Sequence, residues 1–287
     1  MSCGNEENLT MAHIATPASS ATIENLGQFL QVSGEWHKKN ADIDQGMLSE
    51  LWYRGVNRHH PNQAPGVYRD VFTKRAKALK AKVYGEEKRL RLEREMLSQF
   101  RTAGAAFLEG YTRTQIYFVA QHYGMPTRLL DWSTNPLAAL FFACDGGEAE
   151  DGFVYAMNAR QVIPQGANQT PKKRLWPTVM TMRHLYVEYA IGLSFWDEVD
   201  PERKPFVLPV RPDLVPGRIV QQSSCFTLHM HNAEPVNNPT LVTFSVPAKF
   251  KANIREELHR VNINQYTTYN DLDRLSKELK RRWKLDG

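Results

Sequence analysis

The sequence predicts an α+β protein with a mixed, mostly antiparallel sheet and flanking helices. Segments rich in β-branched and aromatic residues, which are typical of strands, are interspersed with segments whose apolar residues recur at helical spacing. The two kinds of segment do not alternate regularly, so a parallel sheet built from βαβ units is not expected. The expected strands are 50–56, 152–158, 206–210, 217–230 and 240–247.

Helical periodicity is clearest in residues 86–110, where apolar side chains form one stripe and charges gather on the other side. That stripe consists of Met96, Leu97, Phe100, Ala103, Phe107 and Leu108. Further helices are expected at 22–39, 115–123, 136–144, 181–196, 248–261 and 270–284. In the last of these, Leu272, Leu275, Leu279 and Trp283 share a face that is expected to close the core.

The chain is expected to form one domain over residues 21–287, with 287 residues in all. Residues 1–20 are small and polar and predict a disordered leader. Residues 159–205 are irregular apart from the helix 181–196, which indicates an inserted, lid-like segment.

Cysteine usage and hydropathy point to a reducing compartment. Cys3, Cys144 and Cys225 lie far apart and show no Cys-x-x-Cys spacing, which argues against a disulfide framework or a structural zinc site. The longest apolar run, Leu137–Cys144, is far shorter than the roughly 20 residues that span a bilayer. We therefore expect a cytoplasmic protein with no membrane partner.

The net charge of +5 is a mild excess, concentrated in residues 69–101 and in the C-terminal "KELKRRWK". Charge runs of this kind are usually solvated surface. The alternative is that a basic helix at 69–101 contacts an anionic polymer, such as a nucleic-acid or protein acceptor.

The densest polar stretch is "QHYGMPTRLLDWSTNP", directly before the apolar run "LAALFFAC". Pro136 suits the first turn of a helix and Asn135 its N-cap, and the all-round apolar continuation predicts a buried helix. Ser133 and Thr134 can satisfy other free backbone N–H groups at this buried helix start. Capping alone therefore explains these polar residues.

Arg128 and Asp131 need another explanation because they lie among Leu129, Leu130 and Trp132. A buried arginine must be paired or must bind an anion. One interpretation is an internal ion pair, and the other is an anionic ligand shared by Arg128 and the helix N-terminus.

Two further residues belong to this hypothesis. Arg54 ends an expected strand directly before Gly55, a residue that lets backbone or ligand approach closely. Two arginines facing one helix start are a common arrangement for binding phosphate or pyrophosphate. His122 at a helix end either stabilises the helix dipole or takes part in proton transfer.

Common catalytic motifs are absent from the sequence. It contains no Gly-x-Gly-x-x-Gly, Walker loop, Gly-x-Ser-x-Gly or His-Glu-x-x-His. The paired histidines in "RHH" and "HMH" lack partners at ligand spacing, so no metal is expected.

Five segments together resemble the FRG domain family, which takes its name from an aromatic-Arg-Gly motif, here Tyr53-Arg54-Gly55. They are "LWYRG", "EREMLSQF", "AQHYGMPTRLLDWSTNPLAALFFAC", "DGFVYAM" and "GRIVQQSSCFTLH". The resemblance extends over roughly residues 22–284.

A weaker resemblance links the chain to ADP-ribosyltransferases of the Arg-Ser-Glu class. It implies NAD as the ligand, with Arg54 as the first motif and Ser133-Thr134 as the second. At the third motif the chain offers Gln221 and Gln222 in place of a glutamate, so Asp131 or Glu95 would have to supply the charge that stabilises a ribosyl cation.

The leading hypothesis is therefore a nucleotide-binding FRG domain, with an NAD-dependent ADP-ribosyltransferase or NAD hydrolase as the candidate enzyme. Such an activity would suit a toxin or antiviral effector. The expected binding residues are Tyr53, Arg54, Gly55, Thr127, Arg128, Trp132 and Ser133. Of these, Arg54 and Arg128 are expected to bind the pyrophosphate, and Trp132 or Tyr53 is expected to stack on a ring of the nucleotide. The candidate catalytic residues are His122, Asp131 and Gln222. Two alternatives stay open: a non-enzymatic interaction module with a buried polar core, and a hydrolase acting on nucleic acid.

Overall fold

A computed structural model of the chain describes residues 21–41, 49–59, 64–78, 86–162, 179–181, 187, 191, 206–212, 223–230, 236, 238, 240–269, 272–283 and 285. The expected leader, most of the lid-like segment, the helix expected at 181–196 and Gln222 lie outside these ranges.

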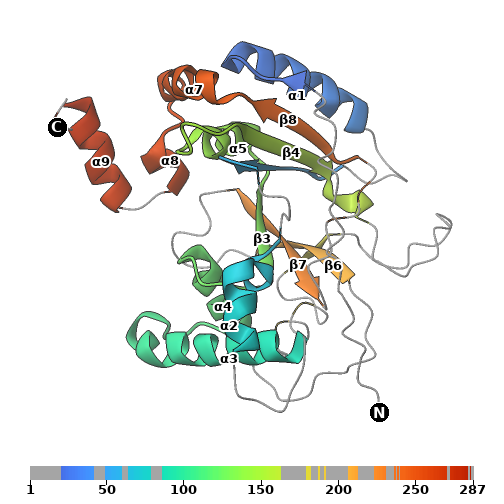
Figure 1. Cartoon of the computed structure of the whole chain (residues 1–287), viewed down its shortest axis with the longest axis vertical. Helices are drawn as coiled ribbons and strands as arrows, with labels where there is room; N and C mark the ends of the chain where they lie inside the picture. Colours follow the sequence, from blue (N-terminus) through green and yellow to red (C-terminus); the bar gives the residue numbers. More distant parts are fainter. Residues whose placement is uncertain are drawn as a thin grey trace, which may run out of the picture.

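Within the described residues, eight strands form one sheet in the order β1-β8-β4-β2-β3-β7-β6-β5 (Figure 1). The strands are β1 (Ala21–Thr22), β2 (Leu51–Val56), β3 (Leu129–Ser133), β4 (Gly152–Asn158), β5 (Met180–Thr181), β6 (Phe206–Arg211), β7 (Ser224–Met230) and β8 (Val242–Val246). The β1–β8 and β5–β6 pairs are parallel and the other pairs are antiparallel. The predicted class, a mixed and mostly antiparallel sheet with flanking helices, is confirmed.

The sheet is divided into two halves between β2 and β3. β2 pairs with β4 along its whole length, and β3 pairs with β7 along its whole length. β2 and β3 themselves share a single pair, Tyr53 with Ser133. Beyond that pair the two strands diverge, and Figure 1 shows the half-sheet β8-β4-β2 above the half-sheet β3-β7-β6.

Each half-sheet has its own layer of helices. The helices are α1 (Leu26–Asn40), α2 (Asp70–Lys77), α3 (Glu86–Ala103), α4 (Arg113–His122), α5 (Pro136–Cys144), α7 (Ala248–Arg260), α8 (Gln265–Tyr269) and α9 (Leu272–Arg282). Helices α1, α5 and α7 pack on β2, β4 and β8, whereas α3 and α4 pack on β3, β6 and β7. A third core, which includes Trp52, Leu130, Trp132 and Tyr155, joins the two halves on their other face.

Several sequence-based expectations were wrong in detail. The segment 129–133, taken as part of a helix entrance, is a strand. The helix expected at 86–110 ends at Ala103, where Gly104 turns the chain, and Phe107 is 86% exposed because it no longer follows the helical stripe. The basic helix expected at 69–101 is two helices, α2 and α3, with residues between them outside the described ranges.

The closing helix α9 also differs from its expected packing. Leu272, Leu279 and Trp283 were expected in the core, yet each is exposed. The side of α9 that meets the rest of the protein carries Glu278, which is buried and lies 3.1 Å from His259 of α7. Polar contacts hold this helix in place, so its apolar stripe does not reach the core.

Candidate functional site

Asn135 caps the start of α5 as the sequence predicts, whereas the Thr134 hydroxyl, also expected to serve the helix start, donates to the Ser223 carbonyl. The Asn135 side chain accepts hydrogen bonds from the backbone N–H groups of Leu137 and Ala138, and Pro136 occupies the first turn. The Ser133 hydroxyl accepts from the Asn135 N–H at 3.0 Å. These side chains are used to begin a largely buried helix, and Ser133 has a structural role that needs no ligand.

Gly55 allows the α5 backbone to approach β2 closely. A Cβ atom at Gly55 would lie 1.8 Å from the carbonyl oxygen of Ala139, and one at Gly152 of β4 would lie 2.1 Å from that of Ala143. Real Cβ atoms are not found at such distances, so α5 sits where it does only because both strands carry glycine there. The structure thus answers the question raised by Gly55: the group that approaches it is the α5 backbone.

Arg54 lies where β2 and β3 separate. Its Nη1 donates to the Asp131 carbonyl at 2.8 Å. The Arg128 carbonyl accepts from His229 of β7, and carbonyls alternate along a strand, so the Asp131 carbonyl is on the β2-facing edge. The guanidinium therefore satisfies a strand edge that the β2 backbone no longer reaches.

One donor of the Arg54 guanidinium, the Nε, is buried and lacks an acceptor among the described residues. Burial lowers the pKa of Arg54, as does the positive charge of Arg69, while Asp131 and Tyr155 act in the opposite direction. Arginine remains protonated at neutral pH, so Arg54 is a cation at this split; Arg69, whose Nε donates to the Ala64 carbonyl at 3.3 Å, and Asp131 are near enough for their charges to act on it. Such an arrangement can bind an anion.

Asp131 presents its carboxylate to α4. Its Oδ2 accepts from the Gln121 side-chain amide at 2.8 Å, and the Asp131 side chain is exposed. The Thr127 hydroxyl donates to Gln121 Oε1, and this fixes which end of the amide faces Asp131. Thr127 also accepts from the Leu129 N–H at 3.1 Å. Thr127 and Gln121 thereby orient a carboxylate on the strand next to Arg54.

Arg128 forms an internal ion pair, the first of the two interpretations of its burial. It is fully buried, and its Nε donates to Glu93 Oε2 of α3 at 2.9 Å, a residue that is also fully buried. The Arg128 backbone N–H donates to Glu93 Oε1 and to the Tyr117 hydroxyl, and that hydroxyl donates to Glu93. Burial alone would lower the pKa of Arg128, but the charge of Glu93 outweighs it and the pKa is raised. The structure does not place Arg128 beside Arg54 as a second pyrophosphate ligand.

The two aromatic residues expected to stack on a ligand are buried. Tyr53 is 3% exposed and contacts Trp36 edge-to-face at 5.7 Å, and burial raises the pKa of its hydroxyl to about 12. The Trp132 indole N–H donates to Thr227 within the third core. Because both rings pack against protein, the expectation that either stacks on a nucleotide is wrong for this conformation.

His122 lies at the C-terminal end of α4, directly after Gln121, and its ring contacts that of Tyr123 edge-to-face at 5.4 Å. Its position near the end of the helix was predicted. A role in proton transfer stays a prediction, as does any role of Gln222, which the structure does not describe.

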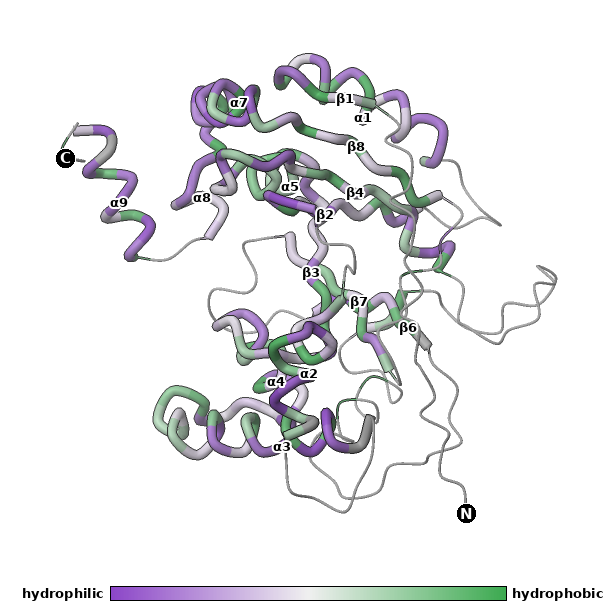
Figure 2. Tube along the Cα trace, in the orientation of Figure 1, coloured by the Kyte–Doolittle hydropathy of each residue, from purple (hydrophilic) through white to green (hydrophobic). Residues whose placement is uncertain are grey.

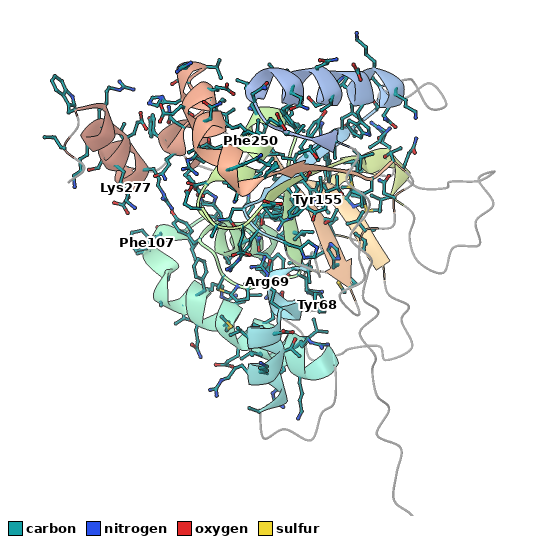
Figure 3. The ribbon with its side chains drawn as sticks, turned by 45° about the horizontal axis from the view of Figure 1, so that its top comes forward. Tyr68, Arg69, Phe107, Tyr155, Phe250 and Lys277 are labelled. Carbon is teal, nitrogen blue, oxygen red and sulfur yellow. The ribbon has the colours of Figure 1, made fainter. Side chains whose placement is uncertain are left out.

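The residue that sequence reasoning missed is Arg69. It follows Tyr68 in a second Tyr-Arg pair, directly before α2, and Figure 3 labels both residues below Tyr155. Its charge acts on Arg54 although 15 positions separate them. The repeated aromatic-Arg pair is the only signal in the sequence that could have suggested it.

A separate cavity has a volume of about 630 Å³. It is bounded by residues that follow α5 and by α7, α8 and α9, and Arg255, His259, Lys277 and Glu278 contribute to its walls. No group of three or more His, Cys, Asp or Glu in the described ranges is arranged to hold a metal ion. None of the described helices has the length and apolar character needed to cross a membrane.

Fold and site together define a mixed α/β protein whose sheet splits beside an arginine, with a buried Arg-Glu pair behind it. The sequence model of the FRG domain matches residues 49–152, so the chain contains an FRG domain. That match runs from just before β2 to the start of β4 and includes Arg54, Arg69, Glu93, Arg128 and Asp131. No curated protein and no solved structure matches the chain.

Proposed function

We propose that the split between β2 and β3 binds the pyrophosphate of a nucleotide, with NAD as the leading candidate. The observation that carries the proposal is the buried Nε of Arg54, which has no hydrogen-bond partner among the described residues and on which the charge of a second arginine, Arg69, acts. A buried donor without an acceptor costs about 1–3 kcal/mol. An anionic ligand that accepts from it would remove this cost and offset the repulsion between the two cations.

Asp131 is the proposed catalytic residue for cleavage of the bond between nicotinamide and ribose. Its oriented, exposed carboxylate lies on the strand that Arg54 contacts. In the proposed reaction the bond between nicotinamide and ribose C1′ breaks, and nicotinamide leaves with the bonding electrons. A water or acceptor oxygen bonds to C1′ and loses its proton to solvent. Asp131 would stabilise the positive charge that develops on the ribose.

A thermal-shift series with NAD, ADP-ribose and ATP at millimolar concentration tests the binding. A ligand present at 100 times its dissociation constant adds about 2.7 kcal/mol to the stability of the folded state. Arg54→Gln and Arg69→Gln should each weaken binding by about tenfold or more, since a charge-assisted hydrogen bond contributes about 1.5–3 kcal/mol. Arg58→Gln, which removes an exposed arginine shortly after β2, should bind like the parent chain.

No shift with any of the three nucleotides, or a shift of full size in Arg54→Gln, would refute the binding site. Chromatographic detection of released nicotinamide then tests the chemistry. Asp131→Asn should abolish release while leaving the shift with ADP-ribose in place. A chain that binds NAD and releases no nicotinamide would be a nucleotide-binding module.

A further inference from the structure

The C-terminal helix α9 presents an apolar stripe to solvent. Leu272, Leu279 and Trp283 are 70%, 43% and 74% exposed, and Leu275 is half-buried. At 100° per residue these four side chains fall within one sector of the helix. Figure 1 shows α9 at the edge of the molecule, projecting away from the sheet and from α7.

The body of the protein holds α9 by its polar side. Glu278 pairs with His259 of α7, and the guanidinium of Arg274 lies 4.3 Å from the ring centre of Tyr269 in α8. A helix that packed on its own domain for stability would turn its leucines inward. The outward stripe of α9 therefore indicates a docking surface that none of the described residues covers.

Basic residues surround the stripe. Helix α9 carries five basic residues, Arg274, Lys277, Lys280, Arg281 and Arg282, and two acidic ones, Asp273 and Glu278. Lys280 and Arg282 flank the apolar sector on its two sides, and Glu278 faces the body of the protein. Figure 2 shows hydrophilic and hydrophobic residues alternating along α9.

The charges beside the stripe indicate what kind of partner covers it. A second copy of the chain would bring two sets of like charges together across the stripe, which is unfavourable. An anionic lipid surface would accept the leucines and the tryptophan at the boundary between headgroups and acyl chains, and it would attract the flanking lysines and arginines.

We propose that α9 is an interfacial helix that docks the protein on an anionic lipid surface. Its stripe of Leu272, Leu275, Leu279 and Trp283 inserts at the headgroup boundary, and the two flanking residues Lys280 and Arg282 contact lipid phosphates. This departs from the expectation of no membrane partner, which rested on the absence of a span, because an interfacial helix lies in the plane of the membrane and needs no span. The proposal does not depend on the nucleotide site.

Co-sedimentation of the full chain with vesicles tests the proposal. Phosphatidylcholine vesicles containing roughly one third phosphatidylserine should pellet the protein, pure phosphatidylcholine vesicles should not, and added salt should weaken the binding. Leu279→Ser/Trp283→Ser should lower the partition coefficient by about tenfold or more, because two large apolar side chains no longer insert. Lys280→Gln/Arg282→Gln should lower it by about fivefold per charge removed.

Matched controls lie on the other half of the molecule. Phe107→Ser removes an equally exposed aromatic ring, and Lys74→Gln/Arg75→Gln removes two exposed charges of α2; both should pellet like the parent chain. Absence of binding to anionic vesicles, equal binding to neutral ones, or unchanged binding of both α9 variants would overturn the proposal. So would a dimer, measured by light scattering, that Leu279→Ser/Trp283→Ser converts to a monomer.

Discussion

Glu93→Gln is expected to destabilise the folded protein more than any exposed charge substitution. Glu93 is fully buried and accepts from the Arg128 Nε, the Arg128 backbone N–H and the Tyr117 hydroxyl. Glutamine has nearly the same shape but no charge, so Arg128 would remain as a buried cation without its counter-ion. Breaking a buried pair in this way costs about 3–5 kcal/mol. That is a large part of the 5–15 kcal/mol by which typical domains are stable.

The assay is urea unfolding, with the free energy of unfolding extrapolated to water. Glu95→Gln is the matched control because Glu95 lies on the exposed side of α3, and it should change stability by less than about 0.5 kcal/mol. The double substitution Glu93→Leu/Arg128→Met should cost less than Glu93→Gln, because neither charge then remains buried. A loss below about 1 kcal/mol in Glu93→Gln would refute the view that this pair holds α3 against β3.

Three further predictions concern packing, hydrogen bonding and thiol chemistry. Gly55→Ala should lower the free energy of unfolding by about 3 kcal/mol or prevent folding, because the new Cβ meets the Ala139 carbonyl. Its control is Gly34→Ala, where nothing lies within 4 Å of the new Cβ; this change should raise the free energy of unfolding by about 0.5–1 kcal/mol in the same urea assay. Lys251→Met should cost about 2–4 kcal/mol in thermal or urea unfolding, because three backbone carbonyls lose a charged donor, and an unchanged midpoint would contradict this. Burial raises the pKa of the Cys144 thiol from 9.0 to about 12, so Ellman's reagent should label it at pH 8 only after unfolding, and fast labelling of the native chain would count against its burial. Because the folded-state pKa is the higher one, the contribution of Cys144 to stability is complete below pH 9 and falls as the pH rises toward 12.

The sequence predicted those features that depend on neighbours along the chain. The cap of α5 follows from Asn135 and Pro136 because capping involves residues within one turn. The glycine at position 55 signalled a close approach, but the sequence could not say that the approaching group is the α5 backbone.

Features that depend on distant pairing were missed. The partner of Arg128 is Glu93, 35 positions away, and Asp131 seemed an equally good partner from the sequence. Glu93 does leave a signal, since it shares the buried side of α3 with Leu90 and Leu97. A carboxylate inside an apolar stripe indicates a buried partner. The signal for Arg69 is weaker, because a repeated Tyr-Arg pair does not show that the charge of Arg69 acts on Arg54.

The outward stripe of α9 shows a different limit. Helical periodicity shows that Leu272, Leu275, Leu279 and Trp283 share a face, and the structure agrees. Periodicity does not reveal what covers that face, because the same pattern serves a domain core, a partner protein and a membrane surface. Only the position of Glu278 against His259 shows which side of the helix meets the body.

The most direct test of the central claim is a crystal structure of the chain soaked with ADP-ribose. We expect pyrophosphate oxygens within hydrogen-bonding distance of the Arg54 Nε and the Arg69 guanidinium, at the split between β2 and β3. We also expect the Arg128–Glu93 pair to be unchanged. Ligand density confined to the cavity beside α7 and α9, or an Arg54 Nε that donates to a protein acceptor with no ligand near it, would contradict the claim.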